Sequence, residues 1–182
     1  MLETIDHINL VVHDLDRMTR FYERVLGLTV SKRVTIGGPW IDRVVGLSGV
    51  AAEVVYLEAR SGPRVELIDY TRPEGQRPPG LERPNTAGLR HLAFRVQDIG
   101  AAVARLRKAG VKLVSEVQQV PDSQVTYRGG VRKRLVYLHD PEQNLIELCE
   151  YCYGPGGTGP DTTAQRQADA HGTDLPPENC AK

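Results

Sequence analysis

The chain has 182 residues, of which 23 are basic and 23 acidic, so its formal charge balances. This length is enough for a well-buried core. A balanced charge provides no basic field for nucleic acid or an anionic membrane surface, so we expect a small-molecule substrate and neither of those partners. No apolar run reaches membrane-spanning length and the N-terminus lacks a signal-peptide pattern, so a cytoplasmic location is expected. The three cysteines are an odd number, which argues against a disulfide framework.

The first half of the chain predicts a strand, a helix and three further strands. Alternating β-branched residues indicate a strand at 5–12. Asp14 is expected to cap a helix at 15–26, which Gly27 should end. Strands should follow at about 28–35, 51–59 and 63–70. The segment 37–47 holds the only tryptophan, Trp40, and is either a packed connector or a lid.

The second half predicts the same order of elements. A strand at 90–96 precedes a helix at 99–109, and strands are expected at 112–119, 131–138 and 144–152. The predicted organisation is a first module at 1–75, a proline-rich linker at 76–87 and a second module at 88–153. A polar tail rich in glycine and proline, without apolar periodicity, occupies 154–182.

The two halves are copies of one another. Residues 6–10 match residues 90–94, with His7 and His91 separated by 84 positions, and residues 65–70 match residues 146–151, with Glu66 and Glu147 separated by 81. The duplication predicts an α+β fold of two mixed sheets, each with a helix on one face. A glutamate inside an apolar strand is costly to bury without a partner. Two histidines and two carboxylates at equivalent places would suit a divalent cation if the copies face each other.

The histidine-bearing strands, the helix after each, and the ending Asp140-Pro141-Glu142-Gln143-Asn144-Leu145-Ile146-Glu147-Leu148 together resemble the vicinal oxygen chelate superfamily. That family includes glyoxalase I, methylmalonyl-CoA epimerase, extradiol dioxygenases, and bleomycin- or fosfomycin-resistance proteins. The resemblance covers about 5–153 and implies two fused βαβββ modules that form a cup, with a metal held by the first and last strands of each. Carried over residue by residue, the ligands would be His7, Glu66, His91 and Glu147. The implied cofactor is one divalent metal ion, zinc first, with manganese, cobalt, nickel or iron as alternatives.

A ligand set split two and two between the modules is similar to glyoxalase I and the epimerases. The resemblance therefore implies an isomerase, a metal-dependent epimerase that abstracts a proton next to a carbonyl through an enolate. Glu147 would be the base and Glu66 its counterpart, with Glu53 a weaker third carboxylate. The substrate would be a cyclic polyhydroxy ketone such as 2-epi-5-epi-valiolone or an acyl-CoA such as methylmalonyl-CoA.

The resemblance leaves three alternatives: a glyoxalase I-type lactoylglutathione lyase, a non-catalytic drug-binding resistance protein, and an extradiol-type dioxygenase. Family members commonly pair, so a homodimer is expected.

Three other features of the sequence invite interpretation. The basic segment 127–134 is either a solvated strand edge or an anchor for an anionic substrate group. Cys149 and Cys152 should face opposite sides of a strand, which leaves Cys149 beside Glu147. His13, His139 and His171 are expected to lie outside the metal site.

Overall fold

The computed structural model describes residues 1–127 and 130–153, which form two compact units. Among the described residues, one unit comprises Met1–Thr86 together with the turn Asp140–Asn144, and the other comprises Ala87–His139 and Leu145–Tyr153. The predicted polar tail, 154–182, lies outside the described residues. The predicted module and linker boundaries stay a prediction.

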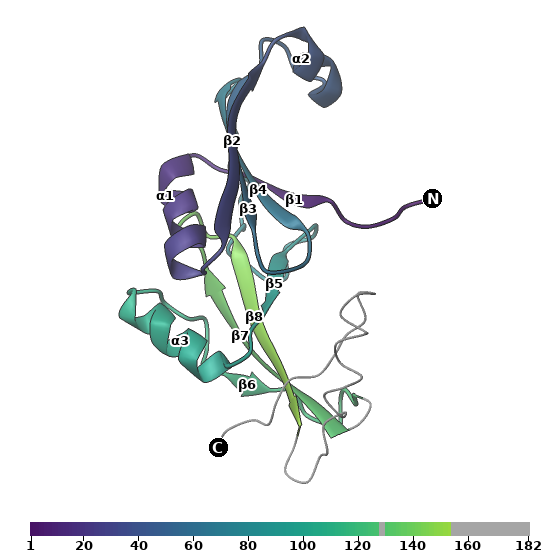
Figure 1. The fold of residues 1–182 in the computed structure, drawn as a ribbon, viewed down its shortest axis with the longest axis vertical. Coiled ribbons are helices and arrows are strands. Elements are labelled where there is room, and N and C mark those ends of the chain that lie inside the picture. Colours follow the sequence, from purple (N-terminus) through teal and green to yellow (C-terminus); the bar gives the residue numbers. More distant parts are fainter. Residues whose placement is uncertain (128–129, 154–182) are drawn as a thin grey trace. The chain divides into compact units, whose positions relative to one another are not determined.

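The first unit contains a four-stranded mixed sheet (Figure 1). Its elements are β1 (His7–Val11), α1 (Leu15–Arg20), the π-helical turn η1 (Phe21–Val25), β2 (Thr29–Gly37), α2 (Pro39–Val45), β3 (Ala51–Glu58) and β4 (Arg64–Arg72). The strand order is β1-β4-β3-β2, with β1 parallel to β4 and the other pairs antiparallel.

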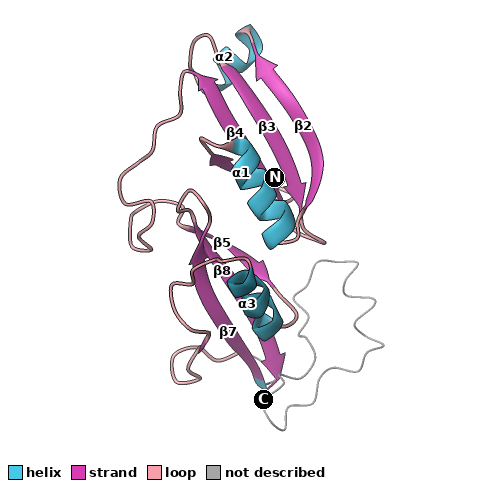
Figure 2. Ribbon diagram, turned by 90° about the vertical axis from the view of Figure 1, so that its left-hand side faces the viewer, coloured by secondary structure: helices cyan, strands magenta, loops and turns pink. Residues whose placement is uncertain are grey.

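The second unit repeats this arrangement, with α3 beside its sheet (Figure 2). Its elements are β5 (His91–Arg95), α3 (Ile99–Lys108), β6 (Gln118–Gln119), β7 (Val131–His139) and β8 (Leu145–Tyr153), in the sheet order β5-β8-β7-β6. Strand β5 is parallel to β8, as β1 is to β4. The predicted α+β fold with a duplicated βαβββ module is confirmed.

The ends of the helices follow from local side chains. Asp14 and Asp98 cap α1 and α3, each accepting a hydrogen bond at 2.9 Å from the backbone amide three residues on, Arg17 N and Ala101 N. Gly27 and Gly110 follow the helices with φ of 84° and 74°, a conformation that favours glycine. The first helix was predicted as one regular segment, but its last turn is a π-helical turn closed by Leu26 N donating to Phe21 O at 3.1 Å.

One predicted strand is largely wrong. Of the span 112–119, only Gln118 and Gln119 form a strand, β6, and Leu113 makes an isolated bridge. Arg107 Nη2 of α3 donates to both carboxylate oxygens of Glu116, at 2.7 and 2.8 Å. The chain bends at 114–116, and this bend interrupts the ladder with β7.

The tryptophan-bearing segment forms the short helix α2, which the sequence analysis did not predict. Asp42 accepts hydrogen bonds from Gly49 N and Val50 N, which closes the turn after the helix. Ile41 is buried, whereas Trp40 is 53% exposed. The segment is therefore a connector packed through Ile41, and its lid role stays a prediction.

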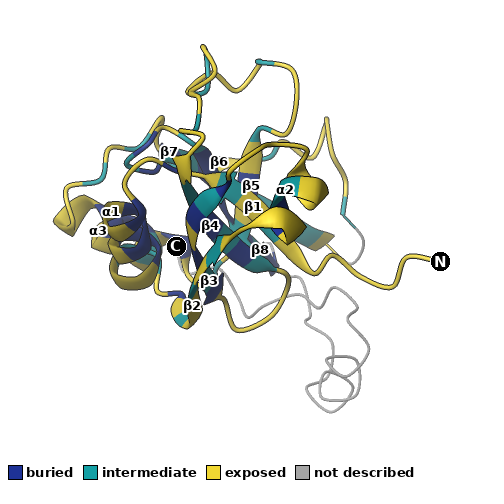
Figure 3. Cartoon of the chain, turned by 90° about the horizontal axis from the view of Figure 1, so that it is seen from above, coloured by how far each residue is buried: buried dark blue, intermediate teal, exposed yellow. Residues whose placement is uncertain are grey.

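The core of the first unit lies between α1 and its sheet (Figure 3). Met18 and Tyr22 are fully buried there, with Val55, Leu57 and Leu67 from the strands. The opposite face of the same sheet carries a smaller apolar cluster of Ala52, Val54 and Ile68, packed against Val34, Ile36, Tyr56 and Tyr70. Glu66 shares this second face, because it pairs with Tyr56 across β3 and β4. Among the described residues, no helix is both long and apolar enough to cross a membrane.

Candidate metal-binding and acid-base site

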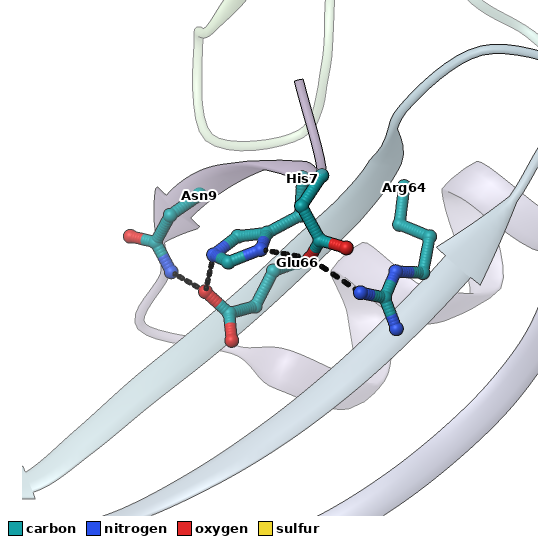
Figure 4. Close-up of polar contacts among 5 residues, drawn as sticks. His7, Asn9, Arg64 and Glu66 are labelled. Atoms are coloured by element: carbon teal, nitrogen blue, oxygen red, sulfur yellow. Dashed lines mark hydrogen bonds and ion pairs between the residues drawn. The ribbon is translucent and has the colours of Figure 1, made fainter. Parts of the chain in front are cut away.

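In the first unit, the parallel pairing of β1 and β4 brings His7 and Glu66 together (Figure 4). Asn9 lies directly opposite Glu66 and donates a hydrogen bond from Nδ2 to Glu66 Oε2 at 2.6 Å. His7 Nε2 lies 3.4 Å from the same oxygen. The Glu66 side chain is only 12% exposed, so its carboxylate depends on these partners for solvation.

A second carboxylate orients the His7 ring. Asp6 Oδ2 lies 2.8 Å from His7 Nδ1 and also pairs with the Arg64 guanidinium. The hydrogen bonds from His7 and Arg64 lower the pKa of Asp6. A histidine that donates from Nδ1 to a carboxylate has its Nε2 lone pair available, which is the usual arrangement of a metal-ligating histidine.

Tyr56 completes the surroundings of Glu66 from β3. The pKa of Tyr56 is raised to about 12, mainly by its hydrogen bond to Glu66 and to a smaller extent by burial. The Arg64 guanidinium lies 5.1 Å from the centroid of the Tyr56 ring. Tyr56 therefore stays protonated and donates to Glu66 throughout the physiological range.

The second unit builds an equivalent pair on β5 and β8. His91 Nε2 lies 3.5 Å from Glu147 Oε2, and Ala93 occupies the position opposite Glu147 that Asn9 holds in the first unit. The Glu147 side chain is 5% exposed, more deeply buried than Glu66. Tyr137 lies opposite Glu147 on β7, and its pKa is raised by burial and by the charge and hydrogen bond of Glu147.

The second unit has no counterpart of the Asn9 amide, and a lysine contacts its glutamate instead. Lys133 Nζ lies 2.6 Å from Glu147 Oε1, although no hydrogen bond of regular geometry reaches this oxygen. Burial alone would lower the pKa of Lys133, but the hydrogen bonding and charge of Glu147 outweigh burial and raise it. Lys133 is therefore an ammonium ion next to the Glu147 carboxylate.

Both pairs have the spacing of two ligands on one metal ion. Two ligands at 2.0–2.2 Å from a tetrahedral ion are about 3.4 Å apart. The gaps of 3.4 Å in the first unit and 3.5 Å in the second match this spacing and are longer than an ordinary hydrogen bond. The imidazole nitrogen and carboxylate oxygen of each pair suit zinc and its neighbours in the transition series. The residues present therefore fit a divalent metal.

Of the four predicted ligands, the structure joins His7 with Glu66 and His91 with Glu147. In the part of the chain that is described, no group of three or more histidine, cysteine, aspartate or glutamate side chains has metal-binding geometry. Binding of one ion by all four residues stays a prediction.

The two tyrosines were missed by sequence reasoning, although a signal was present. Tyr56 and Tyr137 are 81 positions apart, the same offset as Glu66 and Glu147. The β3–β4 and β7–β8 registers place each tyrosine directly opposite the glutamate of its unit. A repeat alignment extended to the third strand of each module would have found them.

Glu53, a weaker candidate, and His13, which was expected to lie outside the metal site, are both away from these pairs. Glu53 neighbours Ala52 and Val54 in β3, so it faces the side of the sheet opposite Tyr56 and Glu66, and its carboxylate lies 3.6 Å from Arg33. The interpretation of Glu53 as a third acid-base carboxylate is therefore wrong. His13 lies beyond the end of β1, where its amide donates to Glu142 at 2.9 Å, and His171 lies outside the described residues.

The two cysteines of β8, Cys149 and Cys152, differ in chemical state. Cys149 is a free, buried thiol on the same face of β8 as Glu147, and burial raises its pKa. Cys152 is disulfide-bonded, although the odd number of cysteines argued against a disulfide framework.

Comparisons with known proteins show the family to which the chain belongs. The family model described as "Glyoxalase/Bleomycin resistance protein/Dioxygenase superfamily" matches residues 4–148. The chain is 30% identical to the uncharacterized protein YaeR of Escherichia coli over 82% of this chain and 97% of that protein. It is 25% identical to the mitochondrial methylmalonyl-CoA epimerase of Homo sapiens over 81% of this chain and 73% of that enzyme. A solved glyoxalase family protein from Bacillus cereus superposes with a TM-score of 0.69 at 32% identity, covering 85% of this chain and 97% of that one.

The chain therefore belongs to the glyoxalase, bleomycin resistance protein and dioxygenase superfamily, and it has the vicinal oxygen chelate fold.

Proposed function

We propose that this protein is a divalent-metal-dependent epimerase that acts on a small molecule by removing a proton next to a carbonyl group. The observation that carries the proposal is the repeated histidine–glutamate pair, with gaps of 3.4 and 3.5 Å that fit a shared metal ion. Similarity to the human methylmalonyl-CoA epimerase supports the class of reaction.

His7, Glu66, His91 and Glu147 would hold the ion, which is zinc or one of manganese, cobalt, nickel and iron. A bound divalent ion supplies Lewis acidity, which polarises a carbonyl and acidifies the neighbouring C–H bond. The hydrogen bond between Asp6 and His7, at 2.8 Å, would orient the imidazole towards the ion.

Glu147 would accept the proton. Its Oε2 faces His91, and its buried Oε1 lies 2.6 Å from the Lys133 ammonium without a hydrogen bond of regular geometry. Glu66 would serve as the acid-base counterpart in the other unit. Two such groups would remove a proton and return one to the opposite face, which inverts the carbon centre.

The substrate is an acyl-CoA of the methylmalonyl type or a cyclic polyhydroxy ketone of the 2-epi-5-epi-valiolone type. The glyoxalase alternative has support in the protein named glyoxylase I 4 of Arabidopsis thaliana, which is 20% identical over 81% of this chain. The matching experiment for that alternative is exchange on a glutathione hemithioacetal.

The test is solvent-deuterium exchange at the α-carbon of these three substrate types, measured by NMR with and without added metal. The wild-type chain should exchange the α-hydrogen of one type only when metal is present. Glu147→Gln keeps an amide oxygen but cannot accept a proton, so exchange should fall by about 10²–10⁴-fold. Glu53→Gln is the matched control, because Glu53 lies on the opposite face of its sheet, and it should exchange at the wild-type rate.

Full exchange by Glu147→Gln would overturn the role of that residue and make Glu66 the next to test. Tight ligand binding without exchange in either form would instead indicate a resistance-type binding protein.

A further inference from the structure

Side chains alternate between the two faces of β7, so the three basic residues 132–134 do not all point to the same side. Arg132 and Arg134 point to one side, where they pair with Asp122 at 3.6 Å and with Glu150 at 3.1 Å. Lys133 points to the other side, which it shares with Tyr137 and Glu147. Of the three cations at 132–134, only Lys133 therefore reaches the candidate site.

The surroundings of Lys133 suit a small acidic group. The ammonium lies 5.8 Å from the centroid of the Tyr151 ring, and the Tyr127 and Tyr151 rings pack in a T-shaped arrangement with centroids 5.6 Å apart. An ammonium has three N–H donors, and among the described residues the structure gives Lys133 one partner for them, Glu147 Oε1. The side chain is 17% exposed, so a ligand bound there would be largely shielded from water.

The duplication argues that Lys133 does more than neutralise Glu147. At the equivalent place in the first unit, 81 positions earlier, stands Ala52, and Glu66 is held by the neutral amide of Asn9. The first unit thus shows that the fold accommodates the β4 glutamate, the counterpart of Glu147 on β8, without a lysine beside it. The lysine is a difference between the two copies, and it lies beside the carboxylate to which we assign proton transfer.

We propose that Lys133 determines substrate specificity by binding an acidic group, a carboxylate or a phosphate, carried next to the reacting carbon. This inference rests on the proposed function for its role in turnover. A substrate acid group paired with Lys133 would lie close to Glu147 Oε1, because the two side chains are 2.6 Å apart, and would bring its neighbouring C–H bond to that oxygen. The selected substrate is then an acid, such as a thioester with a carboxylate on its α-carbon, rather than a neutral polyhydroxy ketone.

The first experiment measures binding alone, in metal-free full-length protein, by calorimetry. Glu147→Gln removes the competing negative charge while retaining the shape of the side chain. Malonate should bind this variant at least about tenfold more tightly than it binds Glu147→Gln/Lys133→Gln, the effect of one hydrogen bond to a charged group. Glu147→Gln/Lys133→Arg should keep most of the affinity, and the neutral analogue malonamide should not distinguish the variants.

Inorganic phosphate is the parallel probe, and the tighter of the two anions identifies the kind of acid group. The inference would be overturned if each anion bound with the same affinity to the variant that has Lys133 and to the variant that lacks it. It would also be overturned if neither anion bound measurably.

The second experiment measures exchange on a matched pair of substrates, a methylmalonyl thioester and its neutral methyl ester. Wild type should prefer the acid in kcat/KM by about tenfold or more after subtraction of the uncatalysed rate, and Lys133→Gln should lose this preference. Equal use of both substrates by wild type would contradict the role of Lys133. Absence of exchange with either substrate would count against the proposed function alone, because the binding experiment decides the inference independently.

Discussion

Replacing Lys133 with methionine should destabilise the metal-free protein, because it leaves Glu147 as a buried charge without its cation. Removal of one partner from a fully buried ion pair costs about 3–5 kcal/mol. Here the Lys133 side chain is 17% exposed, and His91 and Tyr137 remain beside the carboxylate, so we expect a smaller loss of about 2 kcal/mol. For a chain of this size, that loss corresponds to a fall in Tm of about 4–8 °C.

The assay is urea denaturation in the presence of a chelator, carried through a double-mutant cycle. Glu147→Met should also cost stability, because it leaves Lys133 without its counter-ion, whereas Lys133→Met/Glu147→Met should recover most of the loss. Arg107→Met is the matched control, because Arg107 and Glu116 form an ion pair of similar length, 2.7 Å, that is exposed to solvent. This control should cost less than about 1 kcal/mol.

Two results would refute this reasoning about the Lys133–Glu147 pair. One is a Lys133→Met protein within about 0.5 kcal/mol of wild type, the range of an ordinary surface substitution. The other is strictly additive losses in the double variant, which would mean that the two side chains do not interact.

Three further predictions concern metal content, proton binding and assembly. His7→Ala and His91→Ala should each lower the metal content of the purified protein by about tenfold or more, measured by elemental analysis, and unchanged content in both would contradict the ligand set. The tyrosinate absorbance of Tyr56 should develop around pH 12, and Glu66→Gln should shift this pKa towards the ordinary value of 10; an unchanged titration in Glu66→Gln would rule out Glu66 as the cause. Because the raised pKa favours the neutral phenol, the stability that the phenol contributes is complete below pH 10 and is lost as the pH rises through 12. Light scattering should give the mass of a homodimer, and a monomer at micromolar concentration would count against that assembly.

The sequence by itself determined the repeat, the order of the elements, and the strand that carries each histidine and glutamate. These features depend on short-range signals that recur in both halves. Asp14 and Asp98 cap helices through amides three residues away, and His7 and His91 are marked by the similarity of the residues around them. Such signals can be recognised in the sequence without knowing which strands pair.

Only the tertiary structure decided which other side chains surround the two glutamates. Pairing of β3 with β4 and of β7 with β8 sets which residues lie opposite Glu66 and Glu147, and these are Tyr56 and Tyr137. Alternation along β7 selects Lys133 from a run of three basic residues, and alternation along β3 turns Glu53 to the opposite face. A shift of one residue in register would reverse each of these outcomes, and the register depends on contacts between strands distant in sequence.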